Sequence, residues 1–150
     1  MGNIGSTPYQ TDFYAWANEQ AALLRQGRLS EADIANIAEE IESMGKTEKR
    51  ELASRLTVLL AHLLKWRHQP GRRGPSWEVT ITNQRRDLTI LLKDNPSLGA
   101  NAPEAVEYAY ANARGEAYAE TGLPKTTFPP DAPWSFDQIM DQDFWPNDAP

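Results

Sequence analysis

The segment 52–66 constrains the fold more than any other part of the chain, because it is apolar on most sides of a single helix. Its apolar side chains recur every three or four residues, the spacing that predicts an α-helix. They are Leu52, Leu56, Leu59, Leu60, Leu63 and Trp66, with Val58, Ala61 and Leu64 beside them. A helix with so wide an apolar face needs neighbours on several sides, so we expect it at the centre of a helical bundle. Pro70 ends this helix, and its start is expected near Thr47.

Other stretches carry helical patterns of their own, and we expect further helices at 12–26, 30–44, 76–95 and 103–122. The clearest begins at Ser30 and stops at Gly45, where a left-handed C-cap is expected. Its apolar stripe consists of Ile34, Ile37, Ala38, Ile41 and Met44. The short link at Gly45 and Lys46 then predicts an antiparallel hairpin with the central helix.

Together these patterns predict an all-α fold, a single-domain bundle of about five main helices. The bundle is expected at 11–122, after a flexible N-terminal tail at 1–10. Residues 123–150 form an irregular C-terminal segment, rich in proline and aromatic residues, with one short helix starting at Ser135. Because its aromatic side chains would be costly to leave in water, we expect this segment to wrap across the bundle, the alternative being that it covers a partner.

Composition excludes several classes of site. The chain has no cysteine, which rules out disulfides, zinc–thiolate centres, iron–sulfur clusters and cysteine nucleophiles. Its formal charge of −6 makes nucleic acid an unexpected partner, because such binding depends on neutralising phosphates. No apolar run approaches the ~20 residues of a membrane span, and no signal peptide is visible. We expect a cytoplasmic protein with no membrane partner and no cofactor.

The N-terminus carries one short modification pattern. Met1 and Gly2 followed by Ser6 fit the motif for N-myristoylation. The pattern is short, and a disordered tail is the preferred interpretation.

The predicted hairpin brings polar residues of its two helices to the same level. Glu40 comes level with Arg55, and Asp33 with His62, since residues seven apart share a flank of a helix. The pairs are either a structural ladder that fixes the register of the hairpin, or a pocket in which His62 acts as a base oriented by Asp33. The structural ladder is the simpler interpretation.

A metal site is not expected in this region. Helical di-metal proteins use Glu-x-x-His motifs on two helices, and the chain has none. Asp33 and Glu40 would lie ~10 Å apart along their helix, too far to chelate one ion by themselves.

Gln84 is a separate candidate for binding. It lies in the inward stripe of the helix expected at 76–95, where a buried amide needs hydrogen-bond partners. It either bonds within the core or lines a small-molecule pocket.

A basic stretch could hold phosphate or a single nucleic-acid strand. It consists of Lys65, Arg67, Arg72, Arg73, Arg85 and Arg86. The acidic helix at 30–44 and its connector offer an intramolecular complement. Pairing of these charges within the protein, or across a dimer, is therefore the favoured interpretation.

Six segments carry a family resemblance. They are YQTDFYAWANEQAALLRQG, IANIAEEIESMGKTEKREL, LLAHLLKWRHQP, SWEVTITNQRRDL, NPSL and TGLPKTTFP. In their order and spacing, from about 9 to 144, they resemble the bacterial family called domain of unknown function 29. The resemblance implies a compact helical domain standing alone in bacterial cells, and it brings no activity, cofactor or catalytic residue. It also argues against myristoylation, which bacteria generally lack.

Two main hypotheses for the function follow. The leading one is a non-enzymatic protein-interaction or regulatory module of a bacterial cell, which self-associates or binds a protein partner. The alternative is a hydrolase or nuclease-like enzyme that uses His62 with Asp33 and Glu40, while the basic stretch holds a phosphate. A binder of small ligands around Gln84 is a third option. The chain shows no nucleophile elbow, P-loop or Gly-rich dinucleotide turn, which favours the first hypothesis.

Overall fold

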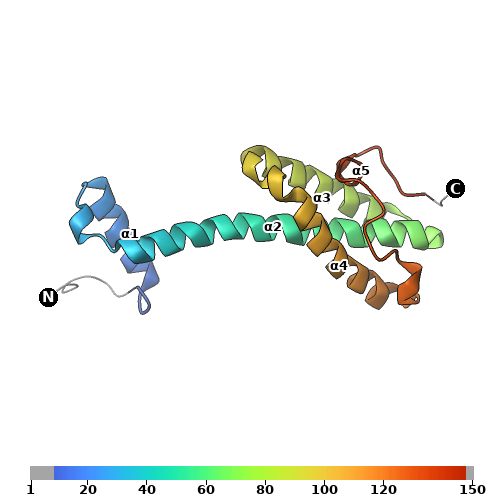
Figure 1. Ribbon diagram of the computed structural model, residues 1–150, viewed down its shortest axis with the longest axis horizontal. Coiled ribbons are helices and arrows are strands. Elements are labelled where there is room, and N and C mark those ends of the chain that lie inside the picture. Colours follow the sequence, from blue (N-terminus) through green and yellow to red (C-terminus); the bar gives the residue numbers. More distant parts are fainter. Residues whose placement is uncertain (1–8, 148–150) are drawn as a thin grey trace. The chain divides into compact units, whose positions relative to one another are not determined.

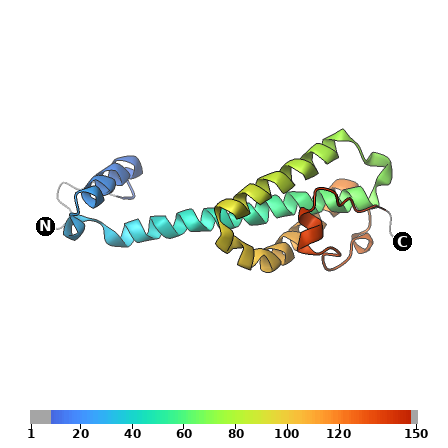
Figure 2. The same ribbon diagram turned by 90° about the horizontal axis from the view of Figure 1, so that it is seen from above.

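The computed structural model describes residues 9–147, and helices dominate it (Figures 1 and 2). Its α-helices are α1 (Phe13–Arg25), α2 (Ile34–His68), α3 (Pro75–Asp94), α4 (Ala102–Thr121) and the short α5 (Phe136–Met140). Short 3-10 turns at Leu29–Glu31, Pro70–Arg72, Pro96–Asn101 and Lys125–Thr127 join them. No strand occurs within 9–147, so the predicted all-α class is confirmed. The acylation pattern at Met1, Gly2 and Ser6 and most of the tail predicted at 1–10 lie outside these residues.

α2 is one continuous helix where the sequence predicted two, and the predicted hairpin at Gly45 and Lys46 is wrong. A glycine inside a helix costs only about 1 kcal/mol relative to alanine. The neighbours of Gly45 are mostly good helix formers, and no proline interrupts α2. Among the described glycines only Gly27 and Gly122 have a positive φ, so the left-handed cap expected at Gly45 does not form.

The contacts of the chain divide it into two compact units. The N-terminal unit extends to Thr47, and the C-terminal unit begins at Glu48. The boundary lies inside α2, two residues after Gly45. The place where the sequence predicted a turn is therefore the place where one set of contacts ends and another begins.

The N-terminal unit has a very small core. It contains α1, whose N-cap Asp12 accepts a hydrogen bond from the backbone of Ala15 at 3.1 Å, and the first part of α2. Between residue 9 and Thr47 only Trp16 and Gln20 are buried. Tyr9 and Phe13 pack against the Trp16 ring with centroid distances of 4.6 and 5.5 Å. This unit is held together by one aromatic cluster and its polar neighbours.

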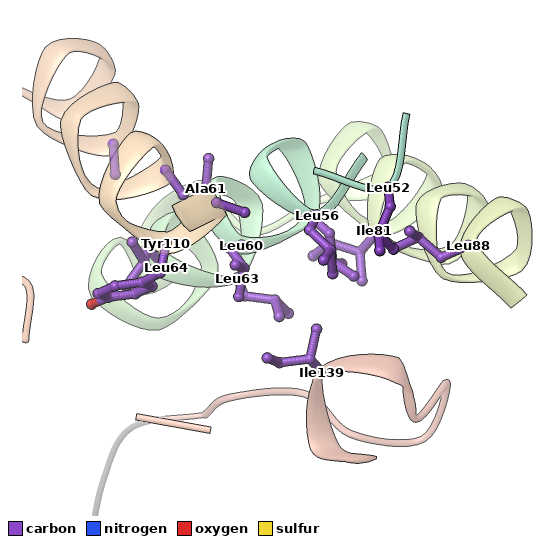
Figure 3. Close-up of a cluster of buried hydrophobic side chains, with 14 of the residues drawn as sticks. Leu52, Leu56, Leu60, Ala61, Leu63, Leu64, Ile81, Leu88, Tyr110 and Ile139 are labelled. Atoms are coloured by element: carbon purple, nitrogen blue, oxygen red, sulfur yellow. The ribbon is translucent and has the colours of Figure 1, made fainter. Parts of the chain in front are cut away.

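The C-terminal unit has a continuous core around the second half of α2. The predicted central apolar segment is confirmed there, since its leucines at 52, 56, 59, 60, 63 and 64 are fully buried. α3 lies alongside this half of α2 (Figures 1 and 2), and Ile81 and Leu88 from α3 and Tyr110 from α4 complete the cluster (Figure 3). Ile139 of α5 reaches the same cluster from the far end of the chain (Figure 3).

The proline-rich C-terminal segment lies on this unit. Phe128 and Ile139 are fully buried in its core. The Tyr110 hydroxyl donates to the carbonyl of Pro129 at 2.6 Å, and the Trp145 ring packs 4.6 Å from that of Trp66. The short helix predicted after Ser135 is confirmed as α5, with a capping box between Ser135 and Gln138. Phe128 is thus part of the core, and Trp134, Phe136 and Trp145 are partly buried against it.

Candidate functional site

Most of the basic stretch is engaged in internal contacts. Lys65 is almost fully buried, forms an ion pair with Glu120 of α4 at 2.7 Å, and lies 5.3 Å from the centre of the Trp77 ring. The Arg73 Nε donates to the backbone carbonyl of Trp66 at 2.7 Å. Further along, Arg67 donates to the Asn147 carbonyl at 3.2 Å, Arg86 lies 4.0 Å from Asp87, and Arg72 is exposed in its 3-10 turn. These cations contact different elements and do not converge on one anion.

Arg85 is fully buried, which the sequence did not predict. Its Nε donates to the carbonyl of Ile139 at 2.7 Å, and its Nη2 to the carbonyl of Gln138 at 3.4 Å. The guanidinium carbon lies 5.7 Å from the centre of the Trp145 ring. Burial lowers the pKa of Arg85 from its ordinary value. Its bonds end on the last turn of α5, so this arginine fastens α5 to α3 and is not placed to hold a phosphate.

Gln84 is half-buried and belongs to a polar cluster around Arg55. The Arg55 Nε contacts Glu51 at 2.9 Å, and its Nη1 contacts Asp87 at 3.1 Å and the Gln84 side-chain oxygen at 3.4 Å. An open groove of about 400 Å³ adjoins this cluster, lined by Glu48, Glu51, Arg55, Asp87, Ile90, Leu91, Asp94 and Asn95. Its carboxylates outnumber its single arginine, so it repels phosphate and would favour a cation. Gln84 does not line it.

His62 is half-buried, and its ring is held by the backbone of its own helix. Its Nδ1 lies 2.8 Å from the carbonyl of Val58, which can only accept, so Nδ1 carries the proton. Burial lowers the pKa of His62, while the bond to Val58 and the negative field of Glu120 act in the opposite direction. The predicted orientation of His62 by Asp33 depended on the hairpin, and that hairpin does not exist.

Asp33 instead holds the N-terminal unit together. Its carboxylate accepts from the Trp16 indole at 3.1 Å and from the Asn36 amide at 2.8 Å, and its backbone N–H donates to Gln20 at 2.7 Å. The hydrogen bond from Asn36 is the main reason that the pKa of Asp33 is lowered. Glu40 is half-buried and lies near Tyr9, whose pKa is raised by burial and by a hydrogen bond to Glu40. The predicted pairs Glu40–Arg55 and Asp33–His62 are therefore replaced by separate contacts within each unit.

α1 covers only one flank of the first part of α2. Asp33, Asn36, Ile37 and Glu40 are half-buried on that flank. The apolar residues beside them remain in contact with solvent, and we call them the open face: Ile34, Ala38, Ile41 and Met44. Ile34, Ile41 and Met44 are exposed by 53%, 63% and 68%. Each residue from 41 to 47 is exposed, so this part of α2 has no packed side at all.

The open face is the feature whose role the sequence reasoning missed, although the pattern itself was visible. The stripe from Ile34 to Met44 was expected to pack in the bundle because its spacing is that of a buried helix face. Periodicity shows that a face is suited to burial, and says nothing about which molecule buries it. The exposure of the same stripe in the structure is the new information.

The described residues contain neither a metal-binding cluster nor a helix suited to a membrane. Residues 9–147 contain no group of three or more His, Cys, Asp or Glu side chains placed to hold a metal ion. Within the same residues, no helix has the length and apolar character needed to cross a membrane.

Comparison with known proteins gives a family and no close relative. No curated protein and no solved structure matches the chain. One family model, described as "Domain of unknown function DUF29", matches residues 8–145, nearly the whole sequence. The chain therefore belongs to the DUF29 family.

Proposed function

We propose that this chain is a non-enzymatic protein-interaction module that binds another protein through the open face of α2. The observation that carries the proposal is the exposure of Ile34, Ile41 and Met44 on one side of a helix whose other flank is already packed. Residues at these spacings lie above one another on a helix, so they form one apolar strip.

The helix itself supports this proposal. Isolated helices are marginal in water, and helices in proteins draw most of their stability from packing an apolar face. The part of α2 from 41 to 47 has no such packing and contains Gly45. A bound partner would supply the missing contact.

The energy available is substantial. Exposures of 53%, 63% and 68% at Ile34, Ile41 and Met44 amount to nearly two whole side chains. Burying that surface stabilises by about 3–5 kcal/mol on each chain that takes part. Such a strip is costly to leave in water and favourable to cover.

Charge favours a protein over a membrane surface or a nucleic acid. Helices that lie on membranes carry lysine and arginine on their polar side. The exposed polar side of this segment instead carries Glu39 and Glu42, with Lys46 as its one basic residue before Thr47. With a net charge of −6 on the whole chain, anionic lipid and nucleic acid would be repelled.

The proposed setting is the cytoplasm of a bacterial cell. A chain without cysteine is compatible with a reducing compartment, and the family resemblance points to bacteria. In this proposal the C-terminal unit is the stably folded part of the protein, and its core includes the C-terminal segment. The N-terminal unit contacts the partner.

Site-specific photo-cross-linking in the native cell tests the proposal. A photo-reactive benzoylphenylalanine replaces Ile41 in one variant and Val79 in the other. Val79 is a matched control because it is 57% exposed on α3 of the C-terminal unit. We expect light-dependent adducts of discrete mass from position 41 and none from position 79. If position 41 gives no adduct, or both positions give the same ones, the open face is not a binding surface.

A further inference from the structure

Resting on the proposed function, we propose that the protein which covers the open face is a second copy of the same chain. Two N-terminal units then pack with the open faces of their α2 segments antiparallel. The interface is two-fold and uses the same residues on both chains.

The first argument is the small core of the N-terminal unit. Units of about 40 residues need a disulfide, a metal or oligomerisation to be stable. The chain has no cysteine, and its described residues hold no metal-binding group. Only Trp16 and Gln20 are buried between residue 9 and Thr47, so burying its apolar surface against another chain would add much to the stability of this unit. A second copy is the partner present wherever this chain is made.

The second argument is the area that the unit exposes. Its large apolar side chains exposed by 40% or more include Phe13, Leu24, Leu29, Ile34, Ile41 and Met44. Together they expose roughly 400 Å² of apolar surface. Homodimer interfaces are about 65% apolar, so this corresponds to about 600 Å² per chain and about 1,200 Å² in all. That total reaches the size of a specific interface.

The spacing of the open face also fits a second copy. Ile34 and Met44 are its two ends, so an antiparallel pairing about a two-fold axis midway between them places Ile34 of each chain opposite Met44 of the other. The apolar strip then covers itself from end to end.

Sedimentation equilibrium of the pure full-length chain is the primary test. At ~100 µM the wild type should have the mass of a dimer, 2 × 16.8 = 33.6 kDa. Ile41→Glu puts a charge into the interface and should weaken association by at least about tenfold. Val79→Glu, at a similarly exposed position of the C-terminal unit (57% against 63%), should leave the dimer unchanged. A monomeric wild type, or a dimer that Ile41→Glu does not weaken, overturns the proposal.

A cross-link provides evidence that does not depend on how Ile41→Glu folds. Because the chain has no cysteine, Ala38→Cys introduces a single thiol beside the two-fold axis, and it should oxidise to a disulfide-linked dimer. Val79→Cys should stay monomeric on a non-reducing gel. If Ala38→Cys does not cross-link, the antiparallel pairing about the centre of the open face is wrong.

The two proposals fail in different ways. A pure chain that is monomeric, together with adducts of another mass from position 41 in the cell, refutes the second copy and leaves the interaction module standing. A monomer without any adduct from position 41 refutes both.

Discussion

Replacing Phe128 with alanine tests whether the C-terminal segment belongs to the core. Phe128 comes after α4, in a part of the chain without regular structure, yet its side chain is fully buried. It packs edge-on against His68 at the end of α2, with ring centroids 5.3 Å apart. The substitution removes an entire aromatic ring from a packed interior.

The expected loss follows from that burial. Phe→Ala in a core costs about 3–5 kcal/mol, out of a total of about 5–15 kcal/mol for a typical domain. For a chain of this size the melting temperature should fall by about 6–20 °C. Deleting everything after Gly122 would also remove Ile139 and should leave the C-terminal unit unfolded, because the combined loss exceeds the whole stability.

Tryptophan fluorescence during thermal and urea unfolding measures this change. Trp66, Trp77, Trp134 and Trp145 lie in the C-terminal unit and only Trp16 in the other, so the signal reports mainly on the unit that contains Phe128. Tyr108→Ala is the matched control on α4, since Tyr108 is 65% exposed and should cost less than about 0.5 kcal/mol. If Phe128→Ala unfolds at the same temperature as this control, the segment is not part of the core and is free to bind a partner.

Three further substitutions examine the C-terminal unit. Arg85→Ala should lower the free energy of unfolding in urea by about 2–4 kcal/mol, because it leaves the Ile139 carbonyl without its donor and opens a cavity. A change below about 0.5 kcal/mol would contradict the view that Arg85 holds α5 to α3. Burial lowers the pKa of His62 below 6.5, so the folded state binds fewer protons and stability should fall as pH drops below that value. His62→Gln should make the free energy of unfolding less dependent on pH in this range. If its pH dependence between about pH 7 and 5.5 is unchanged, other groups are responsible for it. Burial raises the pKa of Tyr110 to about 12. Tyr110→Phe should remove this tyrosine ionisation at high pH from an absorbance titration; a titration that keeps it would assign it to another tyrosine. The substitution should also lower the free energy of unfolding by about 1–3 kcal/mol, since the Pro129 carbonyl loses its partner.

Local signals in the sequence were sufficient for much of the fold. The apolar spacing of 52–66 placed this segment at the centre of its unit, because a helix apolar on several sides has no other stable position. The short helix predicted from Ser135 is α5, and the structure shows that a capping box with Gln138, only three residues away, begins it. Gly122 predicted the end of α4, and it does adopt the left-handed conformation there.

One failure concerns a choice between two neighbouring residues, which local signals do not make. Gln84 and Arg85 both fit the spacing from Ile81 to Leu88, and the sequence prediction placed the Gln84 amide in this inward stripe. The structure buries Arg85, because the carbonyls at the end of α5 satisfy two of its nitrogens. That partner lies more than 50 residues away in the sequence, out of reach of any local pattern.

The candidate site was predicted from a hairpin, so it failed with the hairpin. Asp33 and His62 were brought together only by the turn expected at Gly45. The open face could be recognised as apolar from Ile34 and Ile41, but its exposure depends on how far α1 reaches along α2. How far α1 extends along α2 is decided by the packing within the N-terminal unit, which local sequence patterns do not reveal.

Gly45→Ala distinguishes a continuous helix from a turn at this position. Gly45 lies inside α2, and a Cβ added there meets no atom within 4 Å. Alanine should therefore stabilise the helix by about 0.8–1 kcal/mol and slow amide hydrogen exchange around 41–51 by about fourfold to fivefold. Gly122→Ala is the control, since its φ of +70° is strained for alanine and should cost about 1–2 kcal/mol although its Cβ is equally free of contacts. If Gly45→Ala instead accelerates exchange, as Gly122→Ala does in its own region, Gly45 has a left-handed conformation and α2 is broken there.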